Sequence, residues 1–130
     1  MSFSKKLSAE LAAYDKIHNA ALPNNTSATT DAFLCDGSRL GLEIVGELNA
    51  AVTIPEDKAL TVELHDCATK GGVYAKAATL FSSGAGSVAA GEIFRFAPVS
   101  SMKTWKKIKI TDTANLSAAK LSIRLAHIAG

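Results

Sequence analysis

The residues best suited to chemistry lie in two short runs that place cysteine beside an acidic residue. His65, Asp66 and Cys67 are consecutive, and Cys35 is followed by Asp36. Thiolate, imidazole and carboxylate are the ligand types of tetrahedral zinc sites. The spacing does not favour zinc, because no Cys-x-x-Cys or His-x-x-x-His pair accompanies these residues. We therefore predict no metal site and no cofactor, and we expect Cys67 to pack as a small hydrophobic residue.

Nucleophilic catalysis is also unsupported by the sequence. Asp36 and Asp66 adjoin the two cysteines, and a neighbouring negative charge raises the pKa of a thiol. The serine-rich run at 82–87 does not match the Gly-x-Ser-x-Gly pattern of hydrolases or the Gly-Lys-Ser/Thr ending of a phosphate-binding loop. We predict no catalytic residue and expect that the protein is not an enzyme. A metal-dependent enzyme built on His65 and Cys67 stays as a third alternative, to be tested by zinc analysis.

A short basic cluster surrounds the single tryptophan. Lys103, Lys106, Lys107 and Lys109 flank Trp105. Lysines around an aromatic ring are used by grooves that bind single-stranded nucleic acid. A charged, solvent-facing edge strand that resists edge-to-edge pairing explains the same lysines more simply. The formal net charge of +2 is too small to attract nucleic acid or an anionic membrane, so we expect neither as a partner.

Two-residue alternation dominates the chain after residue 30. The length of 130 residues fits one domain, and 48% hydrophobic with 20% charged residues is a globular composition. Apolar and polar residues alternate in five segments, at 40–44, 60–64, 94–96, 108–110 and 121–125. Turn-rich joints separate them, without a helical pattern between them. This indicates an all-β fold of antiparallel strands, as a sandwich or a barrel. Trp105 falls on the lysine side of a strict alternation, so we expect either a bulge that turns it inward or an interface.

The beginning of the chain has a different period. Five apolar residues recur at helical spacing within an arc of roughly 120°, and they are Phe3, Leu7, Leu11, Tyr14 and Ile17. We predict an N-terminal helical arm over residues 1–23, an extended linker at 24–30, and a β-sandwich domain over residues 24–130. The apolar stripe of the arm must lie on the β body or on another chain.

Two features bear on where the protein is made. Its apolar runs are far shorter than the roughly 20 residues that span a bilayer, and its start is not a signal peptide. We therefore expect a soluble protein that is not exported. In such a chain Cys35 and Cys67 are expected to be buried thiols, with a disulfide as the alternative.

The order of segments after Thr30 resembles a known family. The runs that carry the resemblance lie at 60–67, 77–81, 90–98, 106–110 and 119–125. A Leu-x-Val-x-Leu strand at Leu60 to Leu64, and a glycine followed by an alternating aromatic strand and proline at Gly91 to Pro98, are similar to segments of phage capsid cement proteins with a jelly-roll fold. The arm is not part of that pattern.

The resemblance implies a jelly-roll-like antiparallel β-sandwich that binds the outside of a tailed-bacteriophage capsid. Such a protein ties neighbouring major capsid protein subunits together, works as a homo-oligomer (dimer or trimer), and is made in the host cytoplasm before it joins the virion. The candidate interface residues are the arm stripe, namely Phe3, Leu7, Leu11, Tyr14 and Ile17, together with Trp105. The alternative is a carbohydrate- or receptor-binding β-sandwich of a phage tail or fibre, for which one Trp and two Tyr are available.

Overall fold

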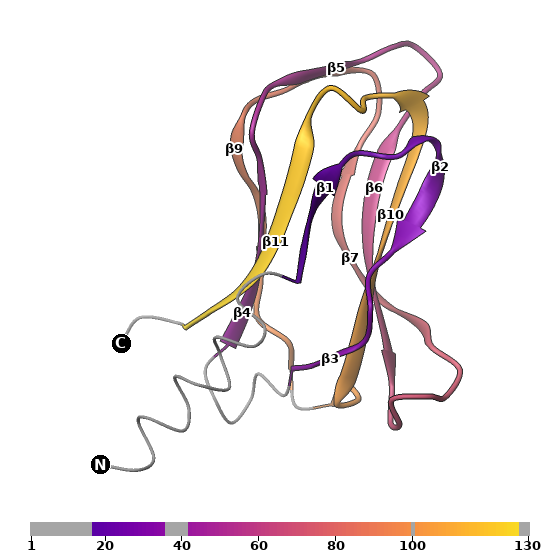
Figure 1. The fold of residues 1–130 in the computed structure, drawn as a ribbon, viewed down its shortest axis with the longest axis vertical. Helices are drawn as coiled ribbons and strands as arrows, with labels where there is room; N and C mark the ends of the chain where they lie inside the picture. The colour runs from indigo at the N-terminus through magenta and orange to yellow at the C-terminus, as the bar shows by residue number, and fades with distance from the viewer. Residues whose placement is uncertain (1–16, 36–41, 100, 128–130) are drawn as a thin grey trace.

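The computed structural model describes residues 17–35, 42–99 and 101–127, and these ranges contain eleven strands and no helix (Figure 1). The strands are β1 (His18–Ala21), β2 (Asn24–Thr29), β3 (Phe33–Leu34), β4 (Leu42–Leu48), β5 (Val52–Ile54), β6 (Leu60–Cys67), β7 (Ala75–Ser83), β8 (Gly86–Val88), β9 (Gly91–Phe96), β10 (Trp105–Asn115) and β11 (Lys120–His127). Among the described residues, none forms a helix that is long and apolar enough to cross a membrane.

The strands pair in a nested order. Strand β1 pairs with β11, β2 with β10, β4 with β9, β5 with β8, and β6 with β7, all antiparallel. The chain is thus one long antiparallel ribbon whose tip is the β6–β7 loop. The ribbon folds on itself, so that β11 also pairs with β4 and β10 also pairs with β6.

This folding gives two stacked sheets (Figure 1). One has the order β1-β11-β4-β9, and the other has the order β2-β10-β6-β7 with β3 added to β10. Two stacked antiparallel sheets made from such a ribbon form a jelly roll. The predicted all-β, jelly-roll-like sandwich is confirmed for the described residues.

Alternating side chains from both sheets fill the space between them. Leu60, Val62 and Leu64 of β6 are fully buried, as are Ile108 and Ile110 of the neighbouring β10. The four alternating segments that are fully described, at 60–64, 94–96, 108–110 and 121–125, lie within strands as predicted. The segment at 40–44 is described from Leu42 onward, and that part opens β4. One aliphatic core therefore joins the inner faces of both sheets.

The predicted boundary at residue 23 is wrong for the last residues of the arm. His18–Ala21 form β1, and Leu22 is buried in the core. The predicted linker is also wrong, because Asn24–Thr29 form β2. Both are edge strands. Nearly all of the β2 side chains are exposed, so the sequence of β2 shows no apolar alternation. Backbone hydrogen bonds to β11 and β10 hold β1 and β2 in place, and the periodicity of a sequence does not reveal such bonds. Residues 1–16 lie outside the described residues.

Candidate docking surface

The outer face of β10, β6 and β7 carries several of the residues that the sequence singled out, and we call it the lysine face. Trp105, Lys107 and Lys109 point outward on β10, because they alternate with the buried residues of that strand. Across the ladder they stand opposite Cys67, His65 and Glu63, in that order. Trp105 therefore lies at the surface without a bulge, which favours the interface among the two predicted alternatives.

The prediction of an edge strand at the lysine cluster is wrong. Strand β10 lies inside its sheet, between β2 and β6. Lys106 points inward and is only 1% exposed, and its Nζ donates a hydrogen bond to the carbonyl oxygen of Lys103. Asp66, also buried, accepts a hydrogen bond of 2.9 Å from the backbone N–H of Lys103. These buried polar groups fix the chain where it enters β10.

Two lysine–aromatic contacts order the end of the lysine face next to the β6–β7 loop, which we call its lower end. The Nζ of Lys107 lies 4.6 Å from the centre of the Tyr74 ring, and the Nζ of Lys70 lies 5.6 Å from the centre of the Trp105 ring. The Tyr74 hydroxyl donates a 2.7 Å hydrogen bond to the carbonyl oxygen of Lys70. The β6–β7 loop is thereby fastened to β10. A shallow, open groove beside it is lined by Asp31, Ala32, Lys70, Gly71 and Lys107.

One carboxylate stands in the middle of the lysine face. Glu63 lies 3.2 Å from the Nε2 of His65 and 3.2 Å from the Nζ of Lys76. The hydrogen bond with His65, together with the neighbouring Lys76, lowers the pKa of Glu63 below its ordinary value. This side chain is therefore a fixed negative charge within a basic surface.

The cysteines are free and buried, as predicted. Cys35 is fully buried, whereas Cys67 is 8% exposed on the outer face. The expectation that Asp66 raises the pKa of its neighbour is wrong. Asp66 points into the sandwich while Cys67 points out, and the backbone N–H of Thr69 is the main cause that lowers the pKa of the Cys67 thiol. Within the described ranges, no cluster of three or more His, Cys, Asp or Glu is arranged to hold a metal ion.

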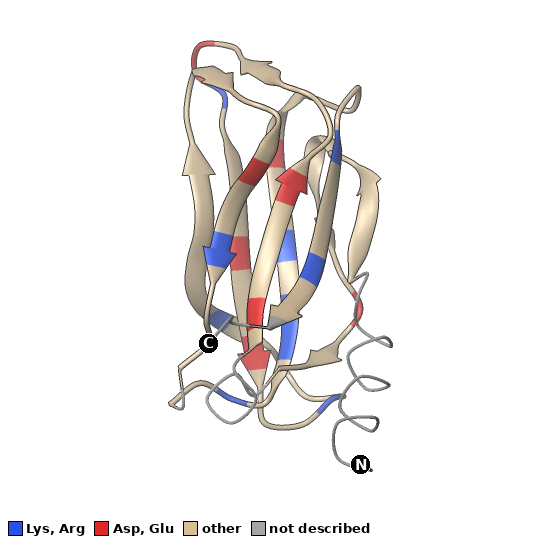
Figure 2. Cartoon of the chain, turned by 90° about the vertical axis from the view of Figure 1, so that its left-hand side faces the viewer, with Lys and Arg blue, Asp and Glu red and all other residues tan. Residues whose placement is uncertain are grey.

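The outer face of the other sheet has a different electrostatic character. Arg95 contacts Glu43 at 3.0 Å and Glu92 at 2.8 Å, and Arg124 contacts Glu47 at 3.2 Å. Figure 2, which views the molecule from this side, shows both signs of charge interspersed along the strands. Both arginines of this face are therefore neutralised by glutamates of the same sheet.

The predicted interface residues divide into three groups. Phe3, Leu7, Leu11 and Tyr14 lie outside the described residues. Ile17 is partly buried against the core of its own chain, and its N–H donates a 2.9 Å hydrogen bond to Ile123. Trp105 is half-buried on the lysine face.

The sequence did not point to Tyr74, Lys70 or Lys76. They reach the lysine face through the nested pairing of β6 and β7, which local sequence does not reveal.

Comparisons with known proteins include a structural likeness. No protein-family model matches the sequence, and no curated protein matches it. Among solved structures, the chain is similar to one from Cowpea mosaic virus top component, described as naturally occurring empty particles. The TM-score is 0.43 at 15% sequence identity, and the match covers 90% of this chain and 89% of the other.

Proposed function

We propose that this protein is a structural component of a phage virion that binds the outer surface of the capsid and cements neighbouring major capsid protein subunits. The observation that carries the proposal is a jelly roll whose core is mainly aliphatic, while its ion pairs and its lysine–aromatic contacts lie on its outer faces. The order of its segments resembles that of capsid cement proteins. Fold alone does not fix function, so the proposal depends on what the surfaces can do.

In the described part of the chain, aliphatic side chains fill the inside of the sandwich. Jelly rolls include capsid proteins, lectins and cupins, and an enzyme of this fold needs polar groups that converge on a substrate or metal. Here Ile44 and Ile123 of one sheet share a core with Leu60, Leu64 and Ile108 of the other, and each of them is fully buried. Packing of this kind supports a protein that acts through its surface.

Oligomerisation fits the same role, and we propose a dimer or trimer. A capsid repeats the same subunit contact many times, so a symmetric oligomer can make several weak contacts at once. Linking such contacts raises the overall affinity by roughly 10²- to 10⁴-fold without any new kind of contact. Clamping then requires only modest affinity at each site.

The arm stripe is a proposed second contact. Deleting residues 1–16 keeps Ile17 and the strand β1 that the sandwich requires. We expect this shortened chain to retain the β-sheet circular dichroism spectrum and to bind shells, or other copies of itself, more weakly. Unchanged shell binding and an unchanged mass in solution would remove the arm from the proposal.

The direct test is co-sedimentation with purified shells of the major capsid protein from the same genome. The proposal predicts binding that saturates at a fixed ratio to capsid subunits. A variant with Ile110→Asp, which places a charge in the closed core, is the unfolded control. Absence of saturable binding would reject the capsid function, and specific ligands on a glycan array would favour the carbohydrate-binding alternative.

A further inference from the structure

We propose that the lysine face is the surface that docks, and that it takes a carboxylate-rich protein surface. This inference rests on the proposed function only in naming the shell as the protein that supplies the carboxylates. It assigns one face of the sandwich, and a chemistry of partner, to the contact.

Unbalanced charge is the first reason. Four lysines, Lys70, Lys76, Lys107 and Lys109, share this face and its lower end with two carboxylates, Asp31 and Glu63. Among the described residues, only Lys76 of these four forms an ion pair. On the opposite sheet, by contrast, Arg95 and Arg124 are both paired with glutamates. A partner with free carboxylates therefore gains charge pairing on the lysine face and much less on the other.

Rigidity is the second reason. Lys107 and Lys109 belong to β10, which is hydrogen-bonded on both sides, so their backbone is fixed before a partner arrives. Both side chains are half-buried, so their aliphatic stems already lie along the sheet. Lys107 is further held over the ring of Tyr74. Little conformational freedom remains to be lost on binding, which favours affinity.

Apolar anchors at one end of the face fit a protein partner. Leu34 of β3 stands opposite Trp105 in the ladder and is 39% exposed. An aromatic and an aliphatic side chain beside charged groups are typical of protein interfaces, where such anchors carry much of the binding energy.

The same geometry disfavours single-stranded nucleic acid. Stacking of a base requires an open ring face, but Lys70 lies over the Trp105 ring and Lys107 lies over the Tyr74 ring. Glu63 stands opposite Lys109 in the ladder, and its negative charge would repel a phosphate bound there. Separate carboxylates on a protein can pair with the lysines and avoid Glu63.

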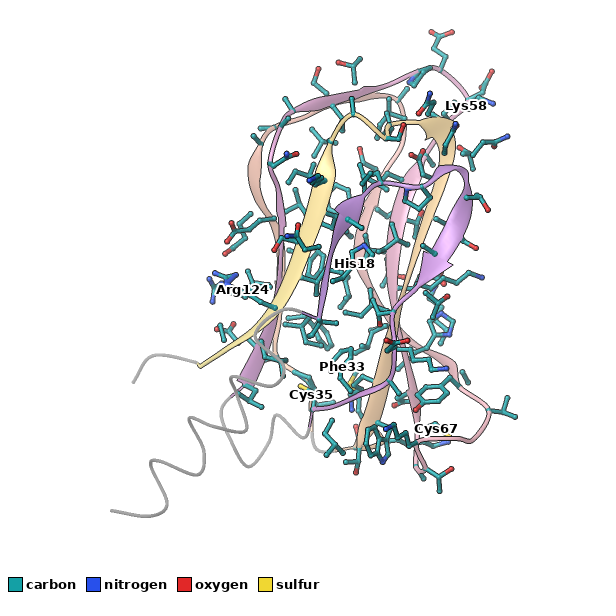
Figure 3. The ribbon with its side chains drawn as sticks, viewed as in Figure 1. His18, Phe33, Cys35, Lys58, Cys67 and Arg124 are labelled. Atoms are coloured by element: carbon teal, nitrogen blue, oxygen red, sulfur yellow. The ribbon has the colours of Figure 1, made fainter. Side chains whose placement is uncertain are left out.

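The experiment compares two double variants with the same change in net charge. Lys107→Gln with Lys109→Gln removes two charges from the lysine face. The matched control, Lys58→Gln with Lys120→Gln, removes two from exposed positions elsewhere. Lys58 lies in the turn between β5 and β6, at the opposite end of the sandwich from Cys67 (Figure 3), and Lys120 opens β11 in the other sheet. Equal melting temperatures would establish that all three proteins are folded alike.

The first readout is shell binding in the co-sedimentation assay. We expect the lysine-face variant to bind shells at least about tenfold more weakly than the wild type, and the control to stay within about twofold, because rim charges contribute by pairing and by steering. Shells that bind both variants equally well would overturn the inference and leave the capsid function standing.

The second readout does not require shells. Trp105 is the only tryptophan, so its fluorescence reports on this face alone. We expect poly-L-glutamate at low salt to change the emission of the wild type and the control, but to affect the lysine-face variant much less. No change in the wild type, or tighter binding of an oligothymidylate of equal charge, would overturn the inference. If shells bind none of the proteins, the capsid function fails and this readout still decides the chemistry of the face.

Discussion

Gly46 provides a sharp test of how the two sheets pack. It lies in β4, between Ile123 of β11 and Phe94 of β9, and all three face the core. A Cβ added at Gly46 would stand 2.8 Å from Cδ2 of the Phe94 ring and closer still to Cε2 and Cζ. The ring thus occupies the space that a side chain would need. Gly46→Ala forces the buried ring to move.

The expected magnitude follows from two opposing effects. Overpacking a closed core costs about 1–3 kcal/mol. Replacing glycine by alanine inside a strand restores roughly 0.5–1 kcal/mol, because the unfolded chain has less freedom to lose. We therefore expect Gly46→Ala to lower the free energy of unfolding by about 1–2 kcal/mol, and the melting temperature by roughly 5 °C for a domain of this size.

A double-mutant cycle measured by urea unfolding identifies the cause. Phe94→Leu alone leaves a gap beside Gly46 and is also destabilising. With both changes together, the new methyl group fills part of that gap, so the loss should be smaller than the sum by about 1 kcal/mol. Wild-type stability of Gly46→Ala, or losses that add within about 0.3–0.5 kcal/mol, would refute the packing described here.

Three further predictions concern titratable groups that are buried or half-buried. Asp112 is fully buried, its Oδ1 accepts a hydrogen bond from Ala114, and its Oδ2 has no partner in the described part of the chain, so burial raises its pKa above the ordinary 3.8. The folded protein therefore loses stability as the pH rises from about 4 through the raised pKa of Asp112, because the buried carboxyl must then be charged. Asp112→Asn should be more stable than the wild type at pH 7 and should lose that advantage near pH 4. Thermal unfolding at both pH values measures this difference. Burial lowers the pKa of His18, so the wild type should lose stability as the pH falls below the ordinary value of 6.5, and His18→Gln should lose less between pH 7 and pH 5; equal pH profiles would contradict this. In the folded protein, Cys67 should react with a thiol reagent before Cys35, because it is partly exposed and its pKa is lowered; labelling in the reverse order, located by mass spectrometry of peptides, would count against the described burial.

The sequence predicted the strands that have one buried face. Leu60 to Leu64 and Leu121 to Leu125 belong to interior strands. One face of each strand meets the core and the other meets water, so apolar and polar residues alternate along the sequence. The edge strands β1 and β2 lack this signal. Strand β2 is polar except for Ala28, and β1 follows a stretch whose spacing is typical of a helix, so only their pairing with distant strands reveals them.

The candidate surface was predictable in part for a similar reason. Alternation placed Trp105 with the lysines of β10, and the structure confirms that Trp105, Lys107 and Lys109 share a face. Alternation does not give the neighbours of a strand, so the central position of β10 was missed. It also does not reveal that the loop before β7 brings Tyr74 under Lys107. Contacts between segments far apart in the chain depend on the nested topology of the whole ribbon.

Thermal disruption of shells, with and without the bound protein, measures cementing itself. Empty shells saturated with the wild-type protein should come apart at a higher temperature than bare shells, because a ligand that binds only the intact shell stabilises it by RT ln(1 + [L]/Kd) at each site. Shells mixed with the Lys107→Gln, Lys109→Gln variant at the same concentration should come apart at a lower temperature than shells with the wild type, because weaker binding stabilises the shell less. Shells that carry the wild-type protein at full occupancy and yet come apart at the temperature of bare shells would contradict the proposed function.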